Sequence, residues 1–357
     1  MRVDVCVPPR TSSTIPPSLG GRVIETGTRV GSDSVTAPVR SDVHPDTVHP
    51  GPLSPGKARP VGLLSDVVRH TIRSTWRADA DVSLPPLPTT SIRGAVLATL
   101  RDMVCIELDR AHCGGCPQLS SCAFPALTPE GARDDDGAQD DRALSPLVLR
   151  PLTPAWTGRS HTLKAGDAVS FDLVLVGPRA MAEAKLVDSA VRSAARRGLG
   201  EDGVAFRAAL PVAVEPTHRL ASNRWQLRFM TPLRLKVDGR VVDAAHFNAN
   251  ALWRAMVRRT LQVVDLVGVA RPTLPASPPL ALETIALRDA RAKRWSNRQG
   301  GAVSWPGVVG SVELRVDDEA AGTVSDIIAL IADVGLGKGT SFGCGAVEPT
   351  ALAPENP

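Results

Sequence analysis

One order of strand and helix patterns occurs twice along this 357-residue chain, and it limits the possible folds more than any other feature. In the first half, every second residue from Val169 to Leu175 is apolar, which is the period of a strand with one buried face. A helical pattern then ends in arginines and Gly198, a typical helix stop. The predicted elements of this half are a strand over 67–81, a helix over 92–104 capped by Thr90 or Ser91, strands over 144–152 and 169–175, a helix over 181–197 and a strand over 203–214.

The second half shows the same order. Apolar and polar residues alternate from Trp225 to Phe229 and again from Leu233 to Val237. The predicted elements that follow are a helix over 247–264, strands over 280–287 and 308–316, a helix over 324–334 and a strand over 344–347. No residue-level repeat links the halves, so the duplication rests on element order. The order strand, helix, strand, strand, helix, strand predicts an α+β chain of two tandem ferredoxin-like (βαββαβ, RRM-like) domains, with a cysteine-rich insertion in the first.

Composition indicates where these domains begin and end. The first 60 residues contain ten prolines and no periodicity, which is typical of a disordered extension. The predicted division is a Pro-rich extension at 1–60, an N-terminal domain at 61–220 with a cysteine knuckle at 105–122 and an acidic loop at 129–142, and a C-terminal domain at 221–352 with a glycine-rich loop at 335–345.

Charge is distributed unevenly, although the net charge is only +4. Residues 221–300 hold fourteen Arg or Lys against five Asp or Glu, which indicates a polyanion-binding surface, whereas the acidic run is most simply a solvated loop. No stretch reaches the roughly 18 consecutive apolar residues of a membrane span, so we expect a cytoplasmic chain without a membrane partner. Tyrosine is absent, which removes one candidate acid or base.

The run GLGKGTSFGCG near the C-terminus places Lys338 among five glycines. Glycine lets the backbone turn its amides outward and approach an anion closely, so this loop is a candidate for facing phosphate. The spacing is not that of a P-loop, and the loop follows a helix instead of preceding one, which argues against a nucleotide cofactor. The alternative is a Gly-rich helix end and turn.

Four cysteines form the pattern C-x7-C-x2-C-x5-C. Four thiolates can complete a tetrahedral zinc shell, and a cytoplasmic chain favours metal over disulfides, so we predict structural zinc at Cys105, Cys113, Cys116 and Cys122. Unmetallated cysteines and an iron–sulfur cluster remain alternatives. If only three cysteines bind, His112 is the expected fourth ligand.

Several motifs occur in an order that resembles the CRISPR repeat-processing endoribonucleases, the sixth numbered Cas protein of the repeat-associated mysterious protein (RAMP) superfamily. The motifs are IRGAVLATLRDMVC, CGGCPQLSSCAF, LSPLVLRPL, LKAGDAVSFDLVLVG, RRGLG, LRFMTPLRLK, RWSNRQ and GLGKGTSFGCG. The resemblance covers about residues 67–348. It implies tandem ferredoxin-like domains that bind a CRISPR repeat hairpin and cut the precursor RNA without metal, by attack of a 2′-hydroxyl that leaves a 2′,3′-cyclic phosphate. It also implies that the protein stays bound to the mature crRNA and joins other Cas subunits of an effector complex.

The resemblance places a general base in or just after the first helix. That helix has no histidine, so His112 is the nearest positional match, with His246 and His161 in reserve; a zinc ligand or a loop histidine remains open for His112. Lys338 is the candidate for neutralising the phosphate during the cut, or a solvated turn lysine. Trp295 and Trp305 are candidates for stacking on bases or for core packing. The residues predicted to contact RNA are Arg93, Arg254, Arg258, Arg294, Arg298, Gly335, Gly337, Lys338, Gly339, Gly343 and Gly345.

Two other functions remain open. The chain could be a repeat-binding subunit that does not cut, which the missing tyrosine and helix histidine favour. A zinc-dependent enzyme is the third class, although four thiolates would leave no open position on the metal.

Overall fold

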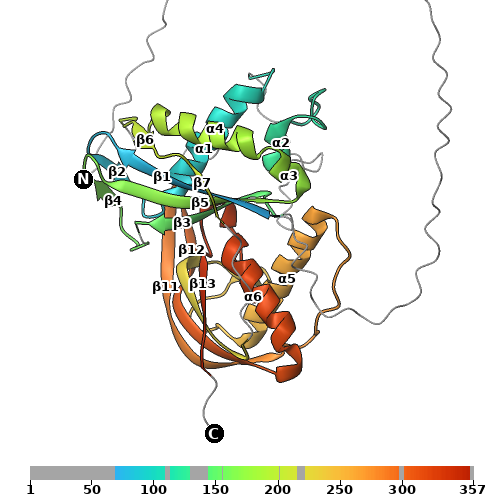
Figure 1. The fold of residues 1–357 in the computed structure, drawn as a ribbon. Coiled ribbons are helices and arrows are strands. Elements are labelled where there is room, and N and C mark those ends of the chain that lie inside the picture. The colour runs from blue at the N-terminus through green and yellow to red at the C-terminus, as the bar shows by residue number, and fades with distance from the viewer. Residues whose placement is uncertain are drawn as a thin grey trace, which may run out of the picture. The chain divides into compact units, whose positions relative to one another are not determined.

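The computed structural model describes residues 69–108, 113–128, 144–154, 156–200, 202–214, 222–296 and 301–353. These residues lie in one compact unit, Pro55–Pro357. They form two larger antiparallel sheets with helices, so the predicted α+β class is confirmed (Figure 1). None of the helices in the described part of the chain combines the length and the apolar character needed to cross a membrane.

The first sheet has the strand order β3-β5-β1-β6, and β7 also pairs with β1. Helices α1 and α4 lie together along one face of it. Its core contains Trp76, whose ring meets that of Phe171 edge-on at 5.2 Å. The elements of this half are β1 (Arg69–Ala78), β2 (Val82–Leu84), α1 (Thr89–Val104), α2 (Ala123–Leu127), β3 (Leu147–Thr153), β4 (His161–Leu163), β5 (Ala168–Val176), α3 (Pro178–Ala182), α4 (Ala184–Arg197), β6 (Phe206–Ala208) and β7 (Val212–Val214).

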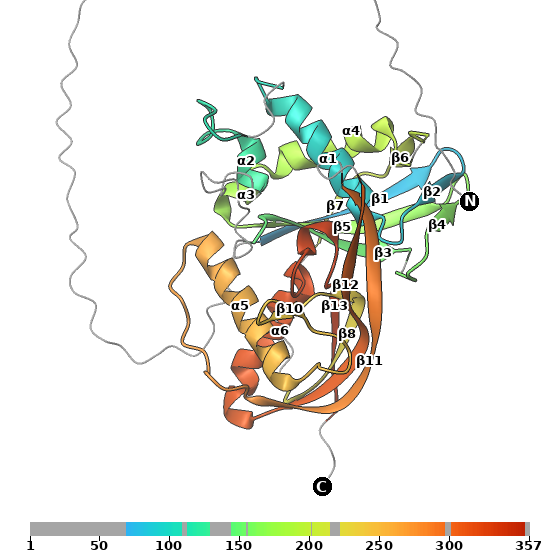
Figure 2. The same cartoon turned by 180° about the vertical axis from the view of Figure 1, so that it is seen from behind.

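The second sheet has the strand order β11-β12-β8-β13. Helices α5 and α6 lie side by side on it, as both ribbon views show (Figure 2). Trp225, Leu227 and Phe229 all point into the same core, as their alternation predicts. The elements are β8 (Arg224–Leu233), β9 (Lys236–Val237), β10 (Arg240–Val241), α5 (Ala249–Val267), β11 (Leu280–Ser296), β12 (Gly301–Val316), η3 (Asp318–Ala320), α6 (Ala321–Val334), η4 (Thr340–Phe342) and β13 (Val347–Ala351).

Several predicted boundaries in the first half are wrong. Helix α1 begins at Thr89 after Pro88, and neither Thr90 nor Ser91 caps it, because the Thr90 hydroxyl donates back to the Leu87 carbonyl. The helix predicted over 181–197 is two helices that meet at Glu183. The strand predicted over 203–214 is interrupted before β7, in a segment that contains Pro211, which has no amide to donate to a neighbouring strand.

In the second half, the predicted strands over 280–287 and 308–316 are too short. Apart from a register shift between Leu282 and Thr284, β11 and β12 stay paired as far as Ser296 opposite Gly301. The outer part of this hairpin carries many polar residues, so its strand character comes from backbone pairing that an apolar pattern does not reveal. The last strand begins at Val347, three residues later than predicted, because the backbone from Gly343 to Gly345 is still turning.

Candidate functional site

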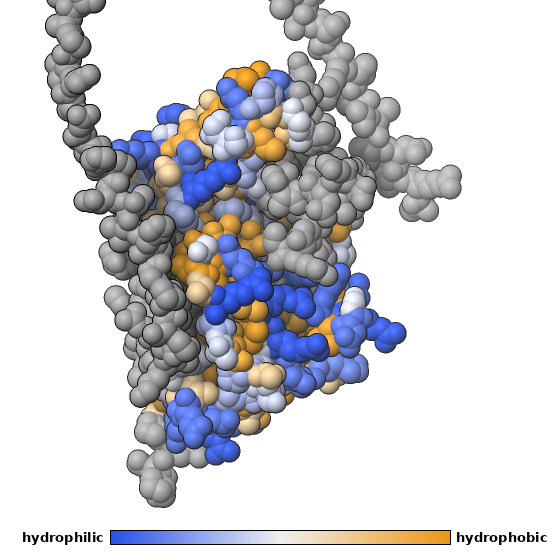
Figure 3. Space-filling view, turned by 90° about the vertical axis from the view of Figure 1, so that its right-hand side faces the viewer, coloured by the Kyte–Doolittle hydropathy of each residue, from blue (hydrophilic) through white to orange (hydrophobic). Residues whose placement is uncertain are grey.

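A basic pocket lies where the glycine-rich loop meets α5, the N-terminal turn of α1 and the turn after β8. Its volume is about 430 Å³. The side of the molecule that carries α5 shows a group of strongly hydrophilic residues in the middle of the face (Figure 3). Asp238 is the one carboxylate among the described residues that line the pocket. The basic residues in the lining are Arg93, Arg234, Lys236, Arg254, Arg258, Arg259 and Lys338.

Helix α5 carries three of these arginines. Asn248 caps the helix, since its side chain accepts a hydrogen bond from the Ala251 amide. Arg254 and Arg258 are exposed and lie four residues apart, so they share one face of the helix. Trp253 and Met256 are buried in the core on another face. The helix therefore packs on its sheet while it holds two guanidinium groups toward the pocket.

The third arginine of α5 is buried. Arg259 is 4% exposed, and its Nη2 donates a hydrogen bond to the Gly337 carbonyl oxygen. Burial lowers the pKa of Arg259 to about 10, so the guanidinium is still protonated at neutral pH. In the part of the chain that the structure describes, its Nε has no hydrogen-bond partner.

The glycine-rich loop directs most of its amides into the protein. Lys338 N donates to the Arg234 carbonyl at 2.9 Å and Gly345 N to the Pro232 carbonyl at 3.1 Å, which ties the loop to the end of β8 and the residues just after it. Gly337 and Gly339 are the two loop glycines in the pocket lining. Seven of the eleven loop amides donate to backbone carbonyls, namely those of Gly335, Leu336, Lys338, Phe342, Gly343, Cys344 and Gly345.

The glycines allow close packing within the protein. A Cβ on Gly345, where φ is +65°, would lie 1.9 Å from the Leu336 carbonyl oxygen. A Cβ on Gly343 would lie 2.2 Å from Thr89 Oγ1. That hydroxyl donates to the Phe342 carbonyl at 2.7 Å and joins the start of α1 to the loop. Tight turning and close approach account for these two glycines without any ligand.

Two arginines stack on aromatic rings beside the pocket. The Arg93 guanidinium carbon lies 4.3 Å from the centroid of Phe342, and that of Arg234 lies 4.9 Å from the centroid of Trp305. The two rings meet edge-on with centroids 5.0 Å apart. Trp305 is 9% exposed and belongs to a small apolar cluster, so core packing describes it better than a free stacking surface.

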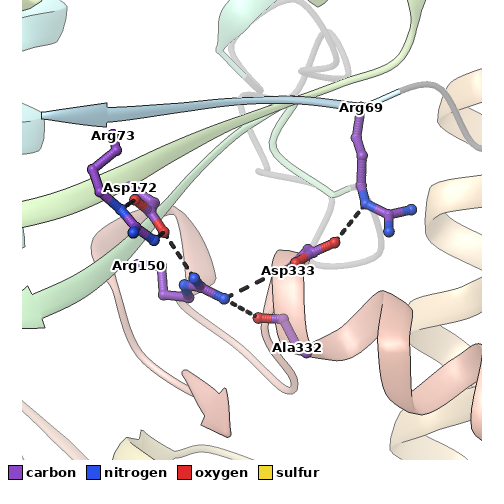
Figure 4. A network of polar contacts seen from close by, with 6 residues as sticks. All are labelled: Arg69, Arg73, Arg150, Asp172, Ala332 and Asp333. Carbon is purple, nitrogen blue, oxygen red and sulfur yellow. Dashed lines mark hydrogen bonds and ion pairs between the residues drawn. The ribbon is translucent and has the colours of Figure 1, made fainter. Parts of the chain in front are cut away.

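Ion pairs connect the first sheet to α6, the helix that leads into the loop (Figure 4). Asp172 in β5 is fully buried and accepts hydrogen bonds from Arg73 and Arg150 at 2.8 to 3.0 Å. Arg150 also donates to the Ala332 carbonyl at 2.8 Å, and Arg69 pairs with Asp333 at 2.6 Å. The hydrogen bonding that Arg73 donates to Asp172 is the main cause that raises the pKa of Arg73. The network holds the end of α6 in place just before Gly335.

The structure brings together most of the predicted RNA contacts that it describes. Arg93, Arg254, Arg258 and Lys338 line one pocket although α1, α5 and the loop are far apart in sequence. His112 and Arg298 lie outside the described residues, and Arg294 is described only as part of strand β11.

Sequence reasoning missed four groups in this pocket. Arg234 and Lys236 alternate with leucines in TPLRLK, a signal that was available. Ser145 and Arg259 gave no signal, because both are buried polar residues that only the packing of distant segments brings to the pocket wall.

No histidine lines the pocket in the described ranges. His246 is exposed and its Nδ1 lies 2.6 Å from Asp243, an interaction that lowers the pKa of that carboxyl. His161 Nε2 lies 3.3 Å from the Pro86 carbonyl oxygen.

The four knuckle cysteines are all partly buried. The described residues bring together no group of three or more His, Cys, Asp or Glu side chains that would hold a metal ion. Zinc at these cysteines stays a prediction.

Cationic groups gathered around one pocket of an α+β chain are typical of the class of proteins that bind a polyanion such as RNA. The family model described as CRISPR-associated endoribonuclease Cas6 matches residues 227–347, and a model described as an N-terminal domain matches residues 67–225. The resemblance drawn from the motifs is thus confirmed: residues 227–347 match the Cas6 family model, and the chain is Cas6-like.

Solved structures with a similar fold include Thermus thermophilus Cas6 (TTHB231), at 14% identity and a TM-score of 0.47, covering 80% of this chain and 99% of that chain. A Cas6-related protein from Pyrococcus furiosus matches at 11% identity and a TM-score of 0.48, covering 79% of this chain and 99% of that chain. Both similarities are distant and add no argument to the family match. A search of the curated proteins gives no match.

Proposed function

We propose that this protein binds the repeat hairpin of a CRISPR precursor RNA and cuts it without a metal ion. The observation that carries the proposal is the basic pocket at the glycine-rich loop. Most of its lining, including that loop, belongs to residues 227–347, which match the Cas6 family model, and Arg93, Leu144 and Ser145 complete it. We also infer that each half is a ferredoxin-like unit. Both sheets place the four strands of their half in the order second, third, first, fourth, which supports this inference.

The proposed reaction needs only acid–base and electrostatic catalysis. The 2′-hydroxyl oxygen attacks the adjacent phosphorus, a base takes the hydroxyl proton, and the bond from phosphorus to the 5′-oxygen breaks as that oxygen gains a proton. The products are a 2′,3′-cyclic phosphate and a 5′-hydroxyl. Lys338 is proposed to stabilise the charge on the phosphate, and His112 is proposed as the base. After the cut, the protein is proposed to retain the crRNA and to pass it to other Cas subunits.

A transcript of the repeat, incubated with the purified chain in EDTA, tests this function. We expect cleavage at one position with a cyclic phosphate on the upstream fragment, and no cleavage of a DNA copy, because DNA lacks the attacking hydroxyl. A scrambled RNA of equal length is the matched control. If the chain binds the repeat tightly and selectively but does not cut it, the second candidate function applies, which is that of a repeat-binding subunit. The lack of a histidine in the described pocket lining and of tyrosine in the chain favours that candidate.

Lys338→Ala is expected to slow cleavage by about 100-fold, the scale of losing one group that stabilises transition-state charge. It should also reduce the slope of log affinity against log salt concentration by about one, since one phosphate contact disappears. Single-turnover rates and binding at several salt concentrations measure the two effects. Lys185→Ala is the control, because Lys185 is exposed on α4 and is not part of the pocket lining. Equal rates for both variants would remove Lys338 from the site.

A further inference from the structure

Arg259 is a buried cation with few hydrogen-bond partners among the described residues. Its side chain lies in the pocket wall, its Nη2 donates to the Gly337 carbonyl, and its Nε has no hydrogen-bond partner among the described residues. Burial of a charge and of an unused donor costs free energy unless another group satisfies them. The sequence position of Arg259, next to the exposed Arg258, gives no hint of this state.

The groups around Arg259 increase the positive charge instead of balancing it. Burial alone causes the lowered pKa of Arg259, and no carboxylate of the described residues offsets it. Arg254, Arg258 and Lys338 line the same pocket, with Asp238 as its one described carboxylate. At neutral pH the guanidinium stays charged, so the pocket favours an anion.

The pocket also has the size and the donors for a small anionic ligand. Its volume of about 430 Å³ is within the range of small-molecule sites, about 300–1,000 Å³. Ser145 lies in the lining, is 8% exposed, and its Oγ has no hydrogen-bond partner within the described residues. A phosphate group offers several strong acceptors to such donors and pairs well with a guanidinium.

We propose that this pocket binds one phosphate-bearing nucleotide, with Arg259 Nε and Ser145 Oγ as the buried donors to its phosphate. Arg254 and Arg258 provide the charged entrance. The inference rests on the proposed function in one respect, since it takes the nucleotide to be part of the repeat RNA. The inference goes beyond that function in two ways. It assigns a role to Arg259, which is not among the predicted RNA contacts, and it defines a subsite for a single phosphate.

The test uses the full-length chain with inorganic phosphate, a ribonucleoside 5′-monophosphate and the matching nucleoside. We expect the two phosphate compounds to raise the melting temperature and the nucleoside to leave it unchanged. Arg259→Lys retains a charge and a long side chain but lacks the Nε donor and the planar fork. It should bind the monophosphate about 10- to 100-fold more weakly by calorimetry, the effect of losing a hydrogen bond to a charged group.

Ser145→Ala provides a second variant if Arg259→Lys does not fold, because it removes one hydroxyl and leaves the tie to Gly337 intact. It should also weaken monophosphate binding. If each folded variant retains wild-type affinity for the monophosphate, Arg259 is only a tether of the loop and the inference is overturned. A lower melting temperature without ligand, combined with an unchanged shift on adding ligand, also overturns it.

RNA oligonucleotides with and without a terminal phosphate identify the source of the group. If the two oligonucleotides bind with equal affinity and Arg259→Lys weakens the binding of both, the pocket takes an internal phosphodiester. If the phosphorylated oligonucleotide binds more tightly, the pocket takes a terminal phosphate. Arg259-dependent binding of the monophosphate without any repeat selectivity would uphold the inference while the proposed function fails. If the protein cleaves the repeat selectively, but Arg259→Lys changes neither its monophosphate binding nor its RNA binding, the proposed function stands and the inference fails.

Discussion

Replacing Asp172 with alanine is expected to lower the free energy of unfolding by about 3–5 kcal/mol, the usual cost of removing one partner from a buried ion pair. The carboxylate is fully buried and accepts from both Arg73 and Arg150. Without it, the two partly exposed guanidinium groups would face each other with no carboxylate between them. Because Arg150 also holds the Ala332 carbonyl, the end of α6 and the loop that follows should lose their fixed position. Urea denaturation measures the stability.

Asp188→Ala is the control for this variant. Asp188 pairs with Arg192 on the surface of α4, where an i,i+4 pair contributes about 0.3–0.5 kcal/mol. Arg150→Met removes both contacts of Arg150, the tie to α6 and the bond to Asp172, while Asp172 stays paired with Arg73. Equal stability of Asp172→Ala and Asp188→Ala would show that the network contributes nothing to the fold.

Gly345→Ala is expected to destabilise the protein by about 2–4 kcal/mol and to abolish repeat binding and cleavage. The added Cβ would lie 1.9 Å from the Leu336 carbonyl oxygen, so the loop must open to accept it. Opening breaks the bonds that Leu336 N and Gly345 N make to Gly345 O and Pro232 O. Lys338 and the wall at Gly337 would then move away from α5. Thermal unfolding and RNA binding measure the effect.

Gly239→Ala tests whether backbone conformation alone explains such a loss. Gly239 has φ of +81°, yet nothing lies within 4 Å of an added Cβ there. It should cost only the conformational penalty of about 1–2 kcal/mol, with unchanged RNA binding. A loss as large as that of Gly345→Ala would contradict the argument from close packing.

The candidate site could be predicted in part. The four-residue spacing of Arg254 and Arg258 placed both on one exposed helix face, and the glycine-rich run marked Lys338. The predicted purpose of the glycines was less accurate. Outward-facing amides were expected, but the amides of Gly335, Gly343 and Gly345 donate to backbone carbonyls. The alternative of a Gly-rich turn describes those three positions, because the same backbone freedom serves close packing as well as an anion.

Local periodicity determined the α+β class and the order of the elements, because burial of one face of a strand or helix imposes a period on nearby residues. Tertiary structure alone decided which distant groups meet. The hydroxyl of Thr89 reaches the Phe342 carbonyl across 253 positions of sequence, and Arg259 becomes a pocket residue only because α5 packs against the loop at Gly337. Such contacts depend on how whole elements pack, and no pattern of neighbouring residues contains that information.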